Sequence, residues 1–185
     1  DFCPTAGPVL YPASLDKSVC AVNTDGAVLW KKECAHGKGN RGGSGAGAST
    51  NVADASAVNA CLPLEPNVFA TGDDDGDIRI WDIRQAKPVC AFDDQEDYIA
   101  DMAVDMARGR LFAASGDGTL GVYNLKQRQL SARSEYLEDE LLSVEIMKGG
   151  KTVVCGSQGG IVNLWDWGSW ANISDRFPGH PESIQ

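Results

Sequence analysis

The sequence predicts an all-β fold made of repeated antiparallel units, because three observations agree. Residues 70–82, 112–124 and 154–166 align without gaps as ATGDDDGDIRIWD, FAASGDGTLGVYN and VCGSQGGIVNLWD, at a period of 42 residues. Each copy holds an apolar run, a glycine-containing turn and a β-branched run, as two strands joined by a tight turn require. The segments between the copies show no 3.6-residue periodicity, so we expect no intervening helices.

Each copy ends in an aromatic residue followed by Asp or Asn. The aromatic residues are Trp81, Tyr123 and Trp165, and the residues that follow them are Asp82, Asn124 and Asp166. A period of about 40 to 45 residues that ends in this pair is the signature of a WD-repeat blade. Such blades are four-stranded sheets arranged around the axis of a β-propeller. We therefore predict a WD-repeat β-propeller with about four blades present.

The predicted strands divide the chain into blades and one insertion. The blades cover residues 9–34, 56–92, 98–134 and 141–178, and a further blade begins in residues 179–185. The first blade is a weaker copy that lacks its inner strand, and the chain stops where another inner strand should begin, so we expect part of a larger propeller. Residues 37–50, GKGNRGGSGAGAST, account for the longer first interval. This composition predicts a flexible surface loop, or alternatively a recognition loop that uses Lys38 and Arg41.

Both histidines of the chain occupy the position that opens a repeat, ahead of an inner strand. They are His36 and His180, and Gln95 takes this position in the middle repeat. In WD-repeat proteins such a histidine bonds to a turn aspartate of its blade. This resemblance implies that Asp75 and Asp117 are structural acceptors. Gly159 replaces the aspartate in the last repeat, so we expect that blade to be held together less tightly.

Composition and charge narrow the classes of partner. The 185 residues carry a net charge of −10, which repels a phosphate backbone, so we expect protein partners and no direct nucleic-acid contact. No apolar run approaches the roughly 18 residues of a membrane span, and no membrane contact is expected. The six cysteines form no C-x-x-C pair, so zinc and dithiol chemistry have no support. We interpret the cysteines as small buried residues in a reducing compartment.

Catalytic interpretations find little support in the residues. Residues 73–77, DDDGD, resemble a calcium loop, but no helices flank them and Asp82 stands where the loop needs a bidentate Glu. The acid pair Glu138 and Glu140 lies between predicted strands, where charged runs are ordinarily solvated. Both histidines belong to the repeat, which leaves no base for a nucleophile. We therefore expect no enzyme activity, no cofactor and no metal.

Several linked segments resemble one particular WD-repeat family. FATGDDDGDIRIWDIR, DYIADMAVD, AASGDGTLGVYNLK and LLSVEIMKGGKTVVCGSQGGIVNLWDWG, in this order, are similar to the WD repeat-containing protein 55 family. The resemblance covers roughly residues 14–184 apart from the insertion. It implies a non-catalytic scaffold of about seven blades in ribosome biogenesis and ribosomal RNA production, with pre-ribosomal assembly factors as partners. It also implies a location in the nucleolus and nucleus, with the cytoplasm as a further location.

A W-D-x-R pattern suggests an alternative function. Residues 81–84, with Trp81, Asp82 and Arg84 at the defining positions, match the pattern by which many WD-repeat proteins dock on the adaptor of cullin-RING ubiquitin ligases. The chain would then be a substrate receptor, and the Arg84 guanidinium would make paired hydrogen bonds to an acidic or carbonyl-lined site. Otherwise Arg84 is a solvated turn residue paired with Asp82 or Asp105.

Two tryptophans fall outside the repeat. Trp167 and Trp170 follow Trp165 in the turn that leaves the third strand of the last blade. Either they pack against each other at the blade edge, or they form an aromatic anchor for a partner peptide.

Overall fold

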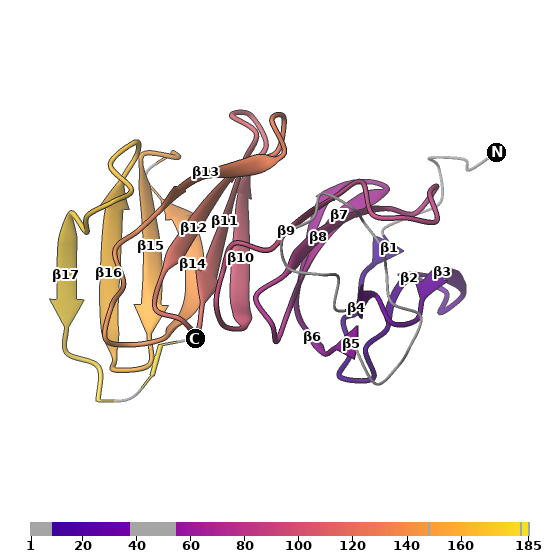
Figure 1. Ribbon diagram of the computed structural model, residues 1–185, viewed down its shortest axis with the longest axis horizontal. Coiled ribbons are helices and arrows are strands. Elements are labelled where there is room, and N and C mark those ends of the chain that lie inside the picture. The colour runs from indigo at the N-terminus through magenta and orange to yellow at the C-terminus, as the bar shows by residue number, and fades with distance from the viewer. Residues whose placement is uncertain (1–8, 38–54, 148, 182, 185) are drawn as a thin grey trace. The chain divides into compact units, whose positions relative to one another are not determined.

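The structure is a computed structural model that describes residues 9–37, 55–147, 149–181 and 183–184 (Figure 1). The predicted insertion therefore lies almost entirely outside the described residues, together with Lys38 and Arg41. Every regular element in the described parts is a strand, and the sheets are antiparallel with three or four strands, apart from one two-stranded pair. The predicted all-β class, built from antiparallel sheets of up to four strands, is confirmed. The described residues contain no helix long and apolar enough to cross a membrane.

The chain divides into two compact units, of which the first comprises residues 1–93. One sheet of this unit has three strands, β1 (Val9–Leu10), β2 (Val19–Asn23) and β3 (Val28–Lys32). A second sheet has four strands in chain order, β6 (Val58–Glu65), β7 (Val68–Asp73), β8 (Ile78–Asp82) and β9 (Cys90–Phe92). Two short strands, β4 (His36–Gly37) and β5 (Ala55–Ser56), pair with each other.

The second unit, residues 94–185, contains two four-stranded sheets. The strands of the first are β10 (Ile99–Asp105), β11 (Arg110–Ser115), β12 (Leu120–Asn124) and β13 (Gln129–Arg133). Those of the second are β14 (Leu141–Met147), β15 (Thr152–Ser157), β16 (Ile161–Asp166) and β17 (Asp175–Pro178). In both sheets the strands follow chain order, so each sheet is one up-and-down blade.

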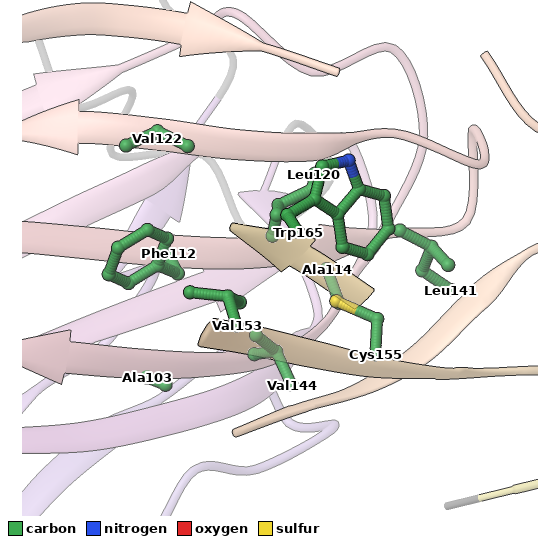
Figure 2. Packing of buried hydrophobic residues seen from close by; sticks show 10 residues of the cluster. All are labelled: Ala103, Phe112, Ala114, Leu120, Val122, Leu141, Val144, Val153, Cys155 and Trp165. Carbon is green, nitrogen blue, oxygen red and sulfur yellow. The ribbon is translucent and has the colours of Figure 1, made fainter. Parts of the chain in front are cut away.

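Alternating side chains build the core of each unit. In the second unit Phe112, Ala114 and their cross-strand neighbours on β12 pack against Val144, Val153 and Cys155 from the other sheet (Figure 2). In the first unit Phe69 and Trp81 are fully buried and cluster with residues of β2. Because apolar burial contributes about 25 cal/mol per Å², these layers are the main source of stability.

The cysteines only partly match their interpretation as buried residues. Cys155 lies fully buried in the core of the second unit. Cys20, Cys34, Cys61 and Cys90 are partly exposed. They sit on strands and in a turn that border solvent, so the apolar sequence around each one overstated its burial. All five are free thiols.

Three glycines explain the 42-residue spacing of the turns. Gly76, Gly118 and Gly160 have φ angles of 85°, 78° and 74°, in the left-handed region that favours glycine. At Gly118 there is also no room for a side chain, because an added Cβ would lie 2.5 Å from the carbonyl oxygen of Leu137. The turn between β11 and β12 therefore packs directly on the segment that leads into the next blade.

We predict that Gly118→Ala destabilises the chain by about 3 kcal/mol, since left-handed strain and a backbone clash add. Gly149→Ala is the matched control, because Gly149 has a φ of 65° but nothing within 4 Å of an added Cβ. The control should cost about 1 kcal/mol. Urea unfolding of both variants measures the difference, and equal losses would contradict the proposed close approach.

Candidate functional site

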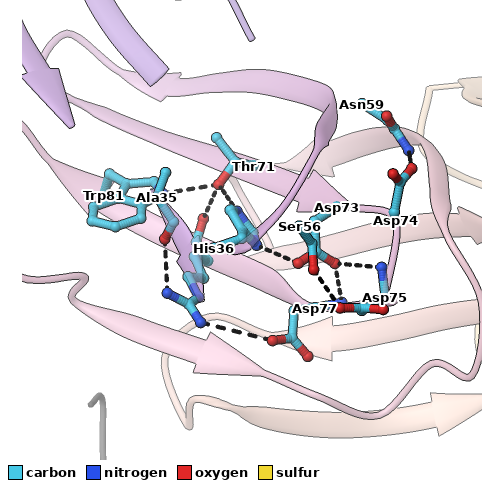
Figure 3. A network of polar contacts seen from close by, with 11 residues as sticks. Ala35, His36, Ser56, Asn59, Thr71, Asp73, Asp74, Asp75, Asp77 and Trp81 are labelled. Carbon is cyan, nitrogen blue, oxygen red and sulfur yellow. Dashed lines mark hydrogen bonds and ion pairs between the residues drawn. The ribbon is translucent and has the colours of Figure 1, made fainter. Parts of the chain in front are cut away.

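A buried polar network ties the β4 segment to the blade that follows it (Figure 3). The Nε2 atom of His36 lies 2.6 Å from the hydroxyl oxygen of Thr71, and its Nδ1 atom lies 3.0 Å from Oδ2 of Asp73. The indole nitrogen of Trp81 donates a hydrogen bond of 2.8 Å to the same Thr71 hydroxyl. Thr71 and Asp73 are two residues apart on β7, and alternation along a strand places both side chains on one face.

One arrangement of protons fits these distances. The Nδ1 atom of His36 carries the ring proton and lies 3.0 Å from the Asp73 carboxylate, while Nε2 accepts from the Thr71 hydroxyl, which in turn accepts from Trp81. Burial lowers the pKa of His36 below 6.5, and the opposing attraction of Asp73 is the smaller effect. The imidazole is therefore neutral, as this arrangement requires.

The side chains follow the same sequence of groups as a catalytic hydroxyl–imidazole–carboxylate triad, but they are not accessible to a substrate. His36 and Thr71 have no exposed surface, and Asp73 is 1% exposed. A nucleophile must reach a substrate, and this hydroxyl is enclosed while the Trp81 indole donates to its oxygen. The geometry therefore supports a structural role for the three residues.

The histidine's carboxylate partner differs from the one we expected. His36 contacts Asp73, whereas Asp75 lies two residues later in the turn and accepts a hydrogen bond from the Ser56 hydroxyl. The reason is that Asp73 ends β7 on the same face as Thr71, while its other oxygen closes the turn by accepting from the backbone N–H groups of Asp75 and Asp77. The two-residue alternation from Thr71 was the signal that could have identified Asp73.

The middle repeat uses a different set of groups around the buried Tyr123. Gln95, which is 2% exposed, places its Oε1 atom 3.1 Å from the Thr119 hydroxyl. That hydroxyl also lies 2.6 Å from Oδ1 of Asp117, which accepts from the Thr119 backbone as well. Asp117 therefore accepts hydrogen bonds within its turn, and Thr119 stands between it and Gln95, the residue in the histidine position.

The last repeat lacks the polar network. Trp165 is fully buried, and its indole nitrogen has no hydrogen-bond partner within the described part of the chain. Cys155 and Ser157 stand 84 residues after Thr71 and Asp73, in the equivalent places on β15. Asp166 and His180 are exposed. The last blade thus keeps the buried aromatic residue but has no threonine or aspartate in the two positions that form the network around Trp81.

The W-D-x-R residues form a contact within their own turn. Arg84 donates from Nε to Oδ1 of Asp82 at 2.8 Å and from Nη2 to Oδ2 at 2.6 Å. These hydrogen bonds lower the pKa of Asp82 to about 2. Arg84 is the solvated member, with 57% of its side chain exposed, and Asp82 is its partner. Asp105, the other candidate partner, is paired with Arg108.

The extra tryptophans pack against each other and against the blade before them. The ring centroids of Trp167 and Trp170 lie 5.2 Å apart at an interplanar angle of 77°, and Phe112 lies 5.7 Å and 5.2 Å from them. The guanidinium carbon of Arg108 lies 4.3 Å from the Trp167 ring centroid. Both indoles remain partly exposed. They therefore form a packed cluster that still has an outer surface.

The aspartate run does not converge on one point. Asp73 binds His36, Asp74 accepts from Asn59, and Asp75 accepts from Ser56. Asp77 lies 3.8 Å from Nη2 of Arg79. Burial, with Asp73 as the next contribution, raises the pKa of Asp77 to about 6. Each carboxylate has a separate neighbour, which is the arrangement of a turn rather than of an ion-binding loop.

Comparisons with known proteins agree with the repeat. The family model "WD domain, G-beta repeat" matches residues 50–82. "WD repeat-containing protein 55" of Pongo abelii is 47% identical over 127 residues, which cover 69% of this chain and 33% of that protein. The protein of the same name from Arabidopsis thaliana is 45% identical over 65% of this chain and 34% of its own length. "WD repeat-containing protein 55 homolog" of Dictyostelium discoideum is 34% identical over 96% of this chain and 39% of its own length. The chain therefore spans about a third of the length of these relatives.

We predict that Thr71→Val destabilises the chain by about 3 kcal/mol, because the buried His36 and Trp81 nitrogens each lose a partner. Cys155→Val changes the equivalent position of the last blade, where no network exists, and should cost less than about 1.5 kcal/mol. Urea unfolding followed by tryptophan fluorescence measures both. If the two variants are equally destabilised, the network does not hold the blade together.

A second prediction concerns pH. The folded-state pKa of Asp77 is about 6, above its ordinary value of 3.8, so its contribution to stability is present at low pH and is lost as pH rises through 6. Asp77→Asn should therefore stabilise the chain at pH 7, by up to about 1 kcal/mol after solvent screening, and the gain should vanish near pH 4. Unfolding at the two pH values tests this. Asp74→Asn, the same charge change at an exposed position of the turn, should give a smaller gain at pH 7.

Proposed function

On the premise that this chain is a WD-repeat protein similar to WD repeat-containing protein 55, we propose that it is part of a non-catalytic scaffold for ribosome assembly. The observation that carries the proposal is the similarity to these relatives over 69% of the chain, on blades of the expected type. WD-repeat proteins generally bind other proteins. The relatives' names specify the repeat alone, so the role in ribosome assembly rests on the family resemblance.

The chemistry of the blades supports a scaffold rather than an enzyme. The one hydroxyl–imidazole–carboxylate arrangement among the described residues is enclosed in a blade and already hydrogen-bonded. A rigid core that leaves its turns exposed is suited to presenting surfaces to partners. We propose that the partners are pre-ribosomal assembly factors in the nucleolus and nucleus, and the net charge of −10 favours contacts with proteins over contacts with RNA.

A second candidate function is that of a substrate receptor for a cullin-RING ubiquitin ligase. The observation in its favour is that Arg84 stays 57% exposed after Trp81-Asp82. The observation against it is that two of the three guanidinium nitrogens of Arg84, Nε and Nη2, already donate to Asp82. An adaptor would have to displace a charge-assisted, bidentate contact or use the remaining nitrogen. Scaffolding is therefore the function that the geometry supports better.

The test of the proposed function is a density-gradient experiment with the tagged full-length protein. We expect the protein to sediment with precursors of the large ribosomal subunit, and its depletion to lower mature large-subunit ribosomal RNA. Sedimentation only with free proteins, together with normal ribosomal RNA levels after depletion, would overturn the proposal.

Arg84→Ala separates the two candidate functions. Within the described residues the Arg84 guanidinium bonds to Asp82 alone, so the variant should fold. We expect unchanged recovery of pre-ribosomal proteins and of any ligase adaptor. Loss of adaptor recovery, with pre-ribosomal proteins retained, would instead establish adaptor docking through this residue. Arg84→Lys is the control, since it keeps the charge without the planar fork.

A further inference from the structure

The two ends of the blades in the second unit differ in charge. In up-and-down sheets, the turns that follow β10, β12, β14 and β16 lie at one end, and those that follow β11, β13 and β15 lie at the other. The first end comprises residues 105–110, 124–129, 147, 149–152 and 166–170, and we call it the basic end. It carries five Lys or Arg residues and two Asp residues. At the other end, residues 94–98, 115–120, 134–140 and 157–161 carry eight Asp or Glu residues and no Lys or Arg.

Direct contacts bring the two sheets together at the basic end. Arg108, in the turn after β10, donates to the carbonyl oxygen of Gly150, in the turn after β14, at 3.0 Å. The same guanidinium lies over the ring of Trp167, just after β16. The turns of both blades therefore form one continuous surface rather than separate tips.

The basic end also exposes apolar side chains. Met106, the first residue after β10, is 41% exposed, and Met147, the last residue of β14, is 49% exposed. Trp167 and Trp170 add partly exposed indoles that rest on the buried Phe112. Unbranched, polarisable methionine side chains adapt to different partners, and partly exposed tryptophans beside them are typical of binding surfaces.

The cations of this end are accessible. Lys126 and Lys151 are exposed, and Arg108 keeps 43% of its side chain exposed although it pairs with Asp105. In a chain with a net charge of −10, a local excess of three positive charges is a distinct feature. Apolar groups beside cations are complementary to a ligand that carries both apolar and acidic groups.

We propose that the basic end of the second unit binds a short acidic segment of a partner protein, in which one or two large apolar side chains lie among Asp and Glu residues. The apolar side chains contact Met106, Met147 and the tryptophan pair, and the acidic ones contact Lys126 and Lys151. The proposal rests on the proposed function, since it names the class of partner that the scaffold holds.

Two observations favour a protein segment over RNA. A base that stacks needs an open ring face, but Arg108 covers one face of Trp167, and both indoles pack on Phe112. An excess of three charges also releases few counterions from a phosphate backbone. The strong negative charge of the opposite end would further repel a long nucleic acid.

The experiment selects peptides from a random phage-displayed library on the immobilised full-length protein. We expect enrichment of sequences with Asp or Glu around Leu, Phe, Met or Trp. Their synthetic versions should bind about tenfold more weakly to the double variant Lys126→Glu/Lys151→Glu, since two exposed charge pairs become repulsive. Met106→Ser/Met147→Ser should weaken binding by a similar factor through loss of apolar contact.

Matched controls keep the outcomes distinct. Lys31→Glu/Lys87→Glu makes the same charge change at exposed positions of the first unit and should leave peptide binding within about twofold. Enrichment of basic or uncharged peptides, no enrichment, or equal weakening by both lysine pairs would overturn the inference. So would binding of a U-rich 20-nucleotide RNA that the basic-end variant alone abolishes, or self-association that the same variant abolishes. Sedimentation of the wild-type protein with ribosomal precursors tests the scaffold proposal alone, so its outcome is distinguishable from that of the peptide-binding experiment.

Discussion

The first unit depends on a hydrogen bond deep inside a blade, the one from the Trp81 indole to the Thr71 hydroxyl. A buried tryptophan contributes a large apolar surface to the core, but it brings an N–H group that costs free energy if it has no acceptor. Thr71 provides the acceptor, His36 Nε2 lies 2.6 Å from the same hydroxyl, and the Asp73 carboxylate lies 3.0 Å from His36 Nδ1. The result fastens the segment that precedes the inner strand onto β7. Arg79 reinforces this fastening by donating to the carbonyl oxygen of Ala35 at 2.7 Å.

The three four-stranded blades differ in how completely the polar group of their buried aromatic residue is hydrogen-bonded. The aromatic residue is buried in all of them, as Trp81, Tyr123 and Trp165, whereas the polar groups around it change from blade to blade. In the last blade Cys155 packs well and accepts hydrogen bonds poorly, and the indole nitrogen stays unpartnered within the described residues. Apolar packing therefore determines the blade fold, and the polar network adds to it where the sequence provides the groups.

The sequence was sufficient for the features that repeat. The 42-residue period located the strands, and Gly118 and its counterparts located the turns, because backbone geometry repeats with the sequence. It was insufficient where side chains choose among nearby partners. The family resemblance indicated Asp75, although the alternation from Thr71 favours Asp73, and Arg84 could pair with Asp82 or Asp105. The contact of Trp167 with Phe112 joins residues 55 positions apart and needed the packing of two blades. The charge difference between blade ends follows from the strand order once each turn is assigned to its end.

The His36 network is enclosed and structural, which is why we propose that the blades act through their outer surfaces. The most direct measurement is nitrogen-15 NMR of the His36 imidazole as pH is lowered from 8. We expect a neutral ring with the proton on Nδ1 that does not titrate near pH 6.5 while the protein stays folded. A ring that carries its proton on Nε2, or that titrates freely near its ordinary pKa, would show that the network is not closed in this way.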